Sequence, residues 1–165
     1  MISKEEFKIG SWVVYPSHGV GKLDNIEKFE VDGETSDFFV ISFLKNKLVL
    51  RLPVGHAIQA GLRRIASKND MKNVFDILIQ KTRRRKTMWS KRVQEYEAKI
   101  NSGDPCMIAE VIRDLHKDGT NNAQSFSERQ IYQLAMERLA REISVIEQIE
   151  EIEAIKKLET VLQAA

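Results

Sequence analysis

The segment from Lys81 to Tyr96 combines many positive charges with one large aromatic side chain, Trp89. It contains no acidic residue before Glu95. Basic side chains around an aromatic ring are typical of a nucleic-acid-binding surface, because the charges attract phosphates while the ring stacks on a base or inserts between bases. Its basic residues up to position 92 are Lys81, Arg83, Arg84, Arg85, Lys86, Lys91 and Arg92.

A structural interpretation of Trp89 is also open. An apolar stripe at helical spacing is formed by Trp89, Val93, Tyr96 and Ile100. On this interpretation the tryptophan turns into a helical core, and the neighbouring charges form a solvated helix face. Trp89 lies near the start of its predicted helix, where a side chain can lean past the end of the packed face. Spacing alone leaves both interpretations open.

Composition indicates a folded protein of one domain or two small ones. Of the 165 residues, 42% are apolar and 30% are charged, which is enough for a core and argues against global disorder. The formal net charge is only +2, so total charge does not identify a nucleic-acid binder. The charges are separated along the chain. The basic segment lies at residues 81–92, whereas six glutamates lie between Glu142 and Glu159 and balance its positive charge. Such separation can orient an anionic partner.

Residues that could carry catalysis or hold a metal are sparse. His18, His56 and His116 lie far apart in the sequence, with no cysteine or carboxylate at ligand spacing. The glycine-rich stretch around Gly19 and Gly21 leads into a predicted strand and lacks the lysine of a P-loop. We therefore expect a protein that is not an enzyme, with no cofactor, no metal and no small-molecule substrate.

The single cysteine and the lack of long apolar runs favour a cytoplasmic location. Cys106 has no second cysteine for an intrachain disulfide, which suits a reducing compartment. The first ten residues are too polar for a signal peptide, and no apolar run approaches membrane-spanning length. We expect no membrane partner.

Residues 1–66 have the pattern of short β-strands bounded by proline and glycine turns. Asp32-Gly33 is a strong hairpin signal between two of these strands. Five short strands in this length predict an α+β protein that begins with a small, strongly bent sheet or Tudor/SH3-like five-stranded barrel. The strands are expected at residues 12–15, 20–29, 38–44, 48–52 and 62–65.

Small barrels often bind another protein, and Arg51 is one candidate contact. On a strand its side chain should point opposite to those of Leu50 and Leu52. It is then either a solvated arginine on the outer face or a contact beside an edge strand that accepts a partner's strand. A second possibility is an aromatic cage for a methylated lysine, although such aromatics also suit a core. The cage would use residues such as Trp12, Tyr15 and Phe38.

Residues 67–165 have helical periodicity, so we place an all-helical C-terminal domain there. The glutamates around 147–153 leave open whether its last part is one helix or two. Helix starts and stops are predicted from capping residues, proline and glycine. They fall at Asn69 or Asp70, near Trp89, near Asn101-Ser102-Gly103, and at Asp104, Gly119 and Ser127.

Three parts of the chain together resemble the CarD/CdnL family of bacterial RNA polymerase-binding transcription regulators. Their order and spacing agree with the family over almost the whole chain, which makes the combination specific. The matching segments are Trp12–Gly21, Leu50–Pro53 with Gly61–Ile65, and Trp89–Arg92 with Gly103–Asp104 and Ala109–Leu115.

This resemblance implies that residues 1–66 form a Tudor-like domain that docks on the β subunit of RNA polymerase. It also implies that residues 67–165 meet promoter DNA near the upstream edge of the transcription bubble. There the family's tryptophan inserts at the minor groove and stabilises the open promoter complex. Trp89 matches this tryptophan, Lys91 and Arg92 match its DNA-backbone contacts, and Arg51 matches the polymerase-contacting arginine.

The chain departs from some relatives in its charges. It ends in an acidic helical segment rather than a basic, AT-hook-like tail, so it resembles the shorter CdnL-type members. Gln94 stands where some relatives have a basic residue, whereas the segment before Trp89 is more basic than theirs. DNA contacts are therefore expected to extend to Arg83, Arg84, Arg85 and Lys86. The rival functions are a peptide or methyl-lysine reader and a nucleic-acid-binding protein that acts without polymerase.

Overall fold

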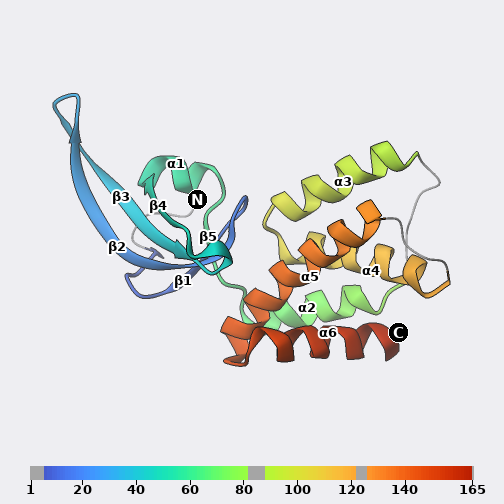
Figure 1. Cartoon of the computed structure of the whole chain (residues 1–165). Coiled ribbons are helices and arrows are strands. Elements are labelled where there is room, and N and C mark those ends of the chain that lie inside the picture. The colour runs from blue at the N-terminus through green and yellow to red at the C-terminus, as the bar shows by residue number, and fades with distance from the viewer. Residues whose placement is uncertain (1–5, 82–87, 122–125, 165) are drawn as a thin grey trace. The chain divides into compact units, whose positions relative to one another are not determined.

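The computed structural model describes residues 6–81, 88–121 and 126–164. The chain divides into two compact units, Met1–Ile65 and Ala66–Ala165. The first unit is built on a β-sheet and the second on helices (Figure 1). The predicted α+β class, with the sheet first and the helices second, is confirmed.

The first unit contains a five-stranded antiparallel sheet with the order β4-β3-β2-β1-β5. The long β2–β3 hairpin closes at Asp32 and Gly33, whose φ angles of 50° and 81° suit a two-residue hairpin turn. Strands β4 and β5 are the two edges, so the described strands form an open sheet. The strands are β1 (Trp12–Tyr15), β2 (Gly19–Val31), β3 (Glu34–Phe43), β4 (Val49–Pro53) and β5 (Arg63–Arg64).

Alternation along the strands places one face of this sheet in an apolar core. A short helix, α1 (Val54–Gln59), contacts β3 and β4 and adds Ala57 to that core. The sequence did not predict α1, because six residues with a single buried side chain show no helical periodicity. The buried members of the core are Phe7, Val13, Tyr15, Leu23, Phe39, Ile41, Phe43, Ala57 and Leu62.

The two glycines at the start of β2, Gly19 and Gly21, have different roles. Gly19 has a φ of +79°, which a glycine adopts without strain at the β1–β2 turn. At Gly21, a Cβ atom would lie 2.7 Å from Cγ2 of Ile41 and 2.9 Å from Cδ1 of Phe43. Gly21 therefore lets β2 and the side chains of β3 pack closely. A packing role accounts for the glycine-rich motif without a ligand.

The second unit consists of five helices in the part of the chain that the structure describes. Helices α4 and α5 contact each other; α2 packs on α4, α6 packs on α5 and α2, and α3 lies against α4 and α5 (Figure 1). A single apolar cluster joins them. The helices are α2 (Lys68–Leu78), α3 (Trp89–Asn101), α4 (Pro105–Asn121), α5 (Phe126–Glu147) and α6 (Glu151–Ala164).

Two helix starts differ from the predicted ones. Helix α2 is capped by Ser67 rather than by Asn69 or Asp70. The Ser67 hydroxyl accepts the N–H of Asp70 at 3.0 Å, and the Asp70 carboxylate accepts the N–H of Ser67 at 3.3 Å. This reciprocal capping box satisfies two backbone donors. Helix α5 begins at Phe126, so Ser127 lies within its first turn.

At the other helix ends, one predicted stop is wrong, and the structure settles whether the last helical segment is one helix or two. Helix α4 continues through Gly119 to Asn121, so the predicted stop at Gly119 is wrong, because glycine is tolerated inside a helix at a modest cost. The final helical segment is two helices. Gln148 has a φ of 57°, a left-handed conformation that ends α5 and redirects the chain into α6.

Glu142 ties the beginning of the helical unit to α5. Its side chain is buried, and Oε2 accepts the backbone N–H of Ala66 at 2.7 Å. Glu142→Ala should lower the free energy of unfolding by about 2 kcal/mol, because it leaves a partly buried N–H unpaired and removes a charge-assisted hydrogen bond. Denaturant unfolding measures this change. Glu142→Gln keeps an acceptor and should cost less; equal losses for both variants would contradict a role for this bond.

Candidate nucleic-acid and protein interfaces

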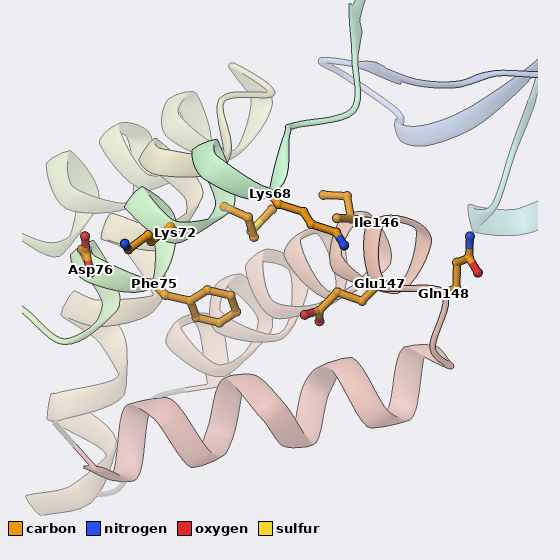
Figure 2. Close-up of a pocket in the computed structure, with 8 residues that line it drawn as sticks. Lys68, Lys72, Phe75, Asp76, Ile146, Glu147 and Gln148 are labelled. Carbon is orange, nitrogen blue, oxygen red and sulfur yellow. The ribbon is translucent and has the colours of Figure 1, made fainter.

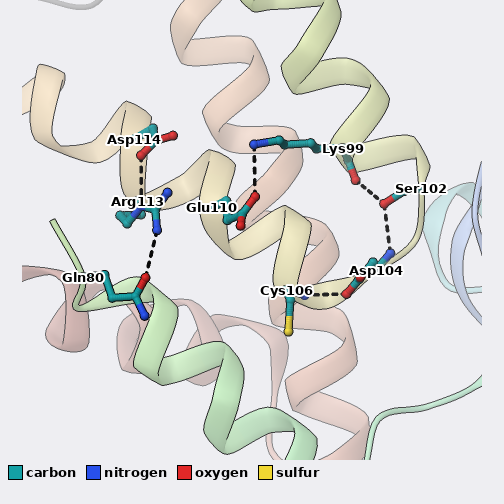
Figure 3. Close-up of polar contacts among 8 residues, drawn as sticks. All are labelled: Gln80, Lys99, Ser102, Asp104, Cys106, Glu110, Arg113 and Asp114. Carbon is teal, nitrogen blue, oxygen red and sulfur yellow. Dashed lines mark hydrogen bonds and ion pairs between the residues drawn. The ribbon is translucent and has the colours of Figure 1, made fainter. Parts of the chain in front are cut away.

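Helix α3 is anchored to the rest of the helical unit at its C-terminal end. Tyr96 and Ile100 are buried in the helical core. Arg138 of α5 donates from Nη1 to the Ile100 carbonyl at 3.2 Å, which satisfies an acceptor in the last turn. Burial and the neighbouring Arg141 lower the pKa of Arg138. Lys99 forms a 3.0 Å ion pair with Glu110 of α4 (Figure 3).

The corner between α3 and α4 is held by a chain of local hydrogen bonds (Figure 3). The Ser102 hydroxyl donates to the Lys99 carbonyl at 2.6 Å and accepts the N–H of Asp104 at 3.2 Å. The Asp104 carboxylate then accepts the N–H of Cys106 at 2.9 Å, which confirms Asp104 as the cap of α4. Gly103 makes the turn with a φ of 76°. These bonds orient α3 on α4 and so position its N-terminal residues.

The basic segment begins directly after a second anchored point. Arg113 of α4 is 4% exposed and forms a 3.0 Å ion pair with Asp114. Its Nη1 also donates to Oε1 of Gln80 at 3.3 Å (Figure 3). Gln80 immediately precedes Lys81, so Arg113 holds the chain where the basic segment starts. This structural role of Arg113 was not predicted from the sequence.

Trp89 is the first residue of α3, and its indole is partly buried. It packs against the helical core, with its ring centroid 6.2 Å from that of Tyr96. The preceding residue, Met88, is the N-cap and is 73% exposed. The tryptophan is partly buried and therefore lies at the margin of the core. This placement combines features of both interpretations of Trp89.

Lys91 and Arg92 follow Trp89 but occupy different environments. Lys91 is exposed. Arg92 is only 9% exposed, and its Cζ atom lies 5.1 Å from the centroid of the Trp89 ring. Its Nε and Nη1 atoms are buried and have no hydrogen-bond partner among the described residues. The structure therefore presents Lys91 for a surface contact with phosphate, whereas Arg92 is largely shielded.

The start of α3 is electrostatically suited to an anion. Its first turn contains no acidic residue, and the N-terminal end of a helix carries partial positive charge. Lys91 adds a full charge there, and Lys81 is also exposed. The other predicted DNA contacts, Arg83, Arg84, Arg85 and Lys86, lie outside the described residues.

In the sheet unit, Arg51 lies on the edge strand β4 and points away from the core. Its side chain is 57% exposed, whereas Leu50 and Leu52 pack against the apolar core, as predicted. Nε of Arg51 lies 3.7 Å from Oε2 of Glu27 on β2, a loose and exposed ion pair. Val49, two residues earlier and on the same face of β4, is 50% exposed.

The residues suggested for a methyl-lysine cage do not converge. Tyr15 is 8% exposed and belongs to the sheet core, with its ring 6.4 Å from that of Phe43. Trp12 lies three residues earlier on β1 and therefore on the opposite face, where Lys22 approaches its ring. Phe38 forms an edge-to-face pair with Phe29 at 5.3 Å. These positions argue against the cage.

The helical unit also carries a surface hollow of about 660 Å³ between α2 and the end of α5 (Figure 2). Lys68, Lys72 and Phe75 line it from α2, and Glu147 lines it from α5. Glu147 also pairs with Lys157 of α6, so charges of both signs surround the hollow. Its groups form no nucleophile–base pair and no set of converging metal ligands.

Other polar groups in the described ranges are explained by packing. No group of three or more histidine, cysteine, aspartate or glutamate residues there could hold a metal. A ring nitrogen of His116 lies 3.1 Å from the hydroxyl of Tyr132, which joins α4 to α5. Burial, with a smaller effect of Glu159, raises the pKa of Tyr132 to about 12. None of the helices in those ranges is long and apolar enough to cross a bilayer.

Two family models match the two units. Residues 7–66 match the CarD-like/TRCF RID domain, and residues 73–159 match the CarD C-terminal domain. The chain belongs to the CarD family of transcription regulators. A CarD relative from Bacillus subtilis (strain 168), "Putative transcription factor YdeB", is 29% identical over 145 residues, which cover 88% of this chain and 95% of that protein.

A solved structure, CdnLNt from Myxococcus xanthus, shares 37% identity with the chain. The alignment covers 41% of this chain and 93% of the CdnLNt chain, with a TM-score of 0.34. The CarD family assignment confirms the resemblance inferred from the three sequence segments. The roles of single residues in this chain are a separate question, and they depend on the geometry described above.

Proposed function

We propose that this CarD protein binds the β subunit of RNA polymerase through its sheet unit, Met1–Ile65, and promoter DNA through its helical unit, Ala66–Ala165. The DNA contact would lie near the upstream edge of the transcription bubble and would stabilise the open complex. The observation that carries the proposal is the placement of Trp89 in the first turn of α3, partly exposed and two residues before exposed Lys91.

The wedge mechanism follows from the energetics of base unstacking. An apolar side chain that inserts between base steps must offset an unstacking cost of a few kcal/mol per step. At the edge of a melted bubble, strand separation has already unstacked the bases, so an inserted side chain needs little further unstacking energy. Trp89 would therefore bind the open state more tightly than the closed duplex. A ligand with such differential affinity shifts the equilibrium towards the open state.

Phosphate contacts would supply the sequence-independent part of DNA binding. Lys91 and the N-terminal end of α3 suit a phosphate beside Trp89. Each neutralised phosphate contributes about −0.9 to the slope of log K against log salt. Arg83, Arg84, Arg85 and Lys86 are proposed as further backbone contacts on the basis of their charge and their position before α3.

Polymerase binding is proposed for the β4 edge. Among the described strands, β4 pairs only with β3, so its other edge is a candidate site for a partner's strand. Val49 and Arg51 project from it on the exposed face. An arginine beside exposed apolar side chains is typical of protein–protein interfaces. Tethering through this edge would raise the local concentration of the helical unit at the promoter.

The direct test uses the full chain, purified RNA polymerase holoenzyme and a promoter fragment. We expect the chain to co-purify with polymerase and to lengthen the lifetime of open complexes challenged with heparin. The expected increase is about tenfold, which corresponds to about 1.4 kcal/mol and lies within the range for one base–aromatic stack. Tight DNA binding that ignores polymerase would instead favour a polymerase-independent nucleic-acid-binding protein.

A further inference from the structure

We propose that Arg92 is a positioning residue for Trp89 and not a phosphate contact. Its guanidinium would hold the indole in the orientation needed at the bubble edge. This inference rests on the proposed function for its role on DNA. Its structural part concerns the free protein alone.

The direction of the Arg92 side chain supports this role. Arg92 lies four residues before Tyr96 and eight before Ile100, so all three occupy the inner face of α3. All three are buried, and α3 packs on α4 and α5. A contact of Nε or Nη1 with DNA phosphate would require the side chain to leave this position. Lys91, one residue earlier, is exposed and needs no such movement.

The buried guanidinium of Arg92 interacts with the indole ring of Trp89. The Cζ atom lies 5.1 Å from the indole centroid, within the range of a cation–π interaction. The planar guanidinium is suited to stacking on an aromatic face, and such contacts are stronger when the cation is desolvated. At 9% exposure, Arg92 is largely shielded from water. The contact therefore restrains an indole that lies at the margin of the core.

The unpaired atoms of Arg92 argue against a role in stability alone. Within the part of the chain that the structure describes, Nε and Nη1 are buried without a hydrogen-bond partner. A buried charge that lacks a partner destabilises a fold. An apolar side chain of similar length would avoid that cost. Arg92 therefore lowers the stability of the fold but stacks on Trp89. Residues of this kind are found where a fixed functional geometry matters more than stability.

The test begins with the free protein in a Trp12→Phe background, where Trp89 is the single tryptophan. Arg92→Met should change the near-UV circular dichroism of Trp89 and increase its quenching by acrylamide. The melting temperature should stay equal or rise. Arg92→Lys, which keeps a cation, should restore part of the Trp89 signal. Unchanged Trp89 signals in Arg92→Met would overturn the proposal, whatever happens on DNA.

The second stage uses promoter DNA and polymerase, with Lys91→Gln as the matched control. Arg92→Met should shorten the open-complex lifetime by roughly 3- to 30-fold, the range that a desolvated cation–π contact can contribute, and leave the salt slope unchanged. Lys91→Gln should reduce that slope by about 0.9 and leave the Trp89 signals unchanged. A reduced salt slope in Arg92→Met would instead make Arg92 a phosphate contact and overturn the positioning role.

The two stages separate this proposal from the proposed function. If Trp89→Ala fails to shorten the open-complex lifetime, the wedge function fails, while the free-protein result for Arg92 still stands. If Trp89→Ala shortens the lifetime but Arg92→Met does not, despite altered Trp89 signals, the positioning role on DNA is wrong.

Discussion

Replacing Trp89 with alanine is expected to shorten the lifetime of open promoter complexes by roughly tenfold or more. Stacking of a base on an aromatic side chain contributes about 1–3 kcal/mol, and about 1.4 kcal/mol corresponds to a factor of ten. The loss should appear in the rate of complex decay after a heparin challenge. Binding of the chain to polymerase should not change, because Trp89 lies in the helical unit and Arg51 in the sheet unit.

Two further variants separate the wedge from the packing role of Trp89. Trp89 contacts the helical core, so alanine will also lower stability, and the melting temperature must be measured beside the lifetime. Trp89→Phe keeps an aromatic ring and should retain part of the lifetime. Trp12→Phe, at the other tryptophan, should leave the lifetime unchanged. An unaltered lifetime in a folded Trp89→Ala protein would rule out the wedge.

Reversing the charge at Arg51 is expected to weaken binding to an isolated β-subunit fragment by at least tenfold. The Arg51 side chain is 57% exposed and only loosely paired with Glu27, so it is available to a partner. Arginines at interface hot spots commonly contribute 2 kcal/mol or more. Arg51→Glu should therefore raise the dissociation constant measured by calorimetry or a pull-down titration. Binding to free DNA should stay the same.

The matched control is a charge reversal on the other unit, Lys91→Glu. It changes net charge by the same amount but should leave β-subunit binding intact while weakening DNA binding. The fold should tolerate Arg51→Glu, because exposed ion pairs such as Arg51–Glu27 contribute little to stability. If Arg51→Glu and Lys91→Glu bind the β-subunit fragment equally well, Arg51 is a solvated arginine without a role in docking.

Strands and long helices were predictable because their signals are local. The predicted strand at residues 12–15 is β1, residues 49–52 of the strand predicted at 48–52 lie in β4, and Asp32-Gly33 forms the predicted hairpin turn. The helix from Trp89 to Asn101 and the Asp104 cap were also predicted. In each case the alternation, periodicity or turn chemistry is contained within a few neighbouring residues.

The errors arose where local signals compete. Asn69, Asp70 and Ser67 can all cap a helix, and the reciprocal bonds between Ser67 and Asp70 decide for Ser67. Gly119 suits a helix end but is also tolerated inside α4. Helix α1 has too few residues to show a period. Packing and hydrogen bonding of the whole unit resolve such choices.

The sequence by itself determined the family, the order of sheet and helices, and the clustering of positive charge around Trp89. Only the tertiary structure decided which of these charges face outward. The spacing of Arg92, Tyr96 and Ile100 already places Arg92 on the inner face of α3, but a charged residue is ordinarily expected at the surface. Because α3 packs on α4 and α5, the guanidinium is buried against the indole, whereas Lys91 remains exposed. Burial depends on neighbours that are distant in sequence, and local spacing does not contain them.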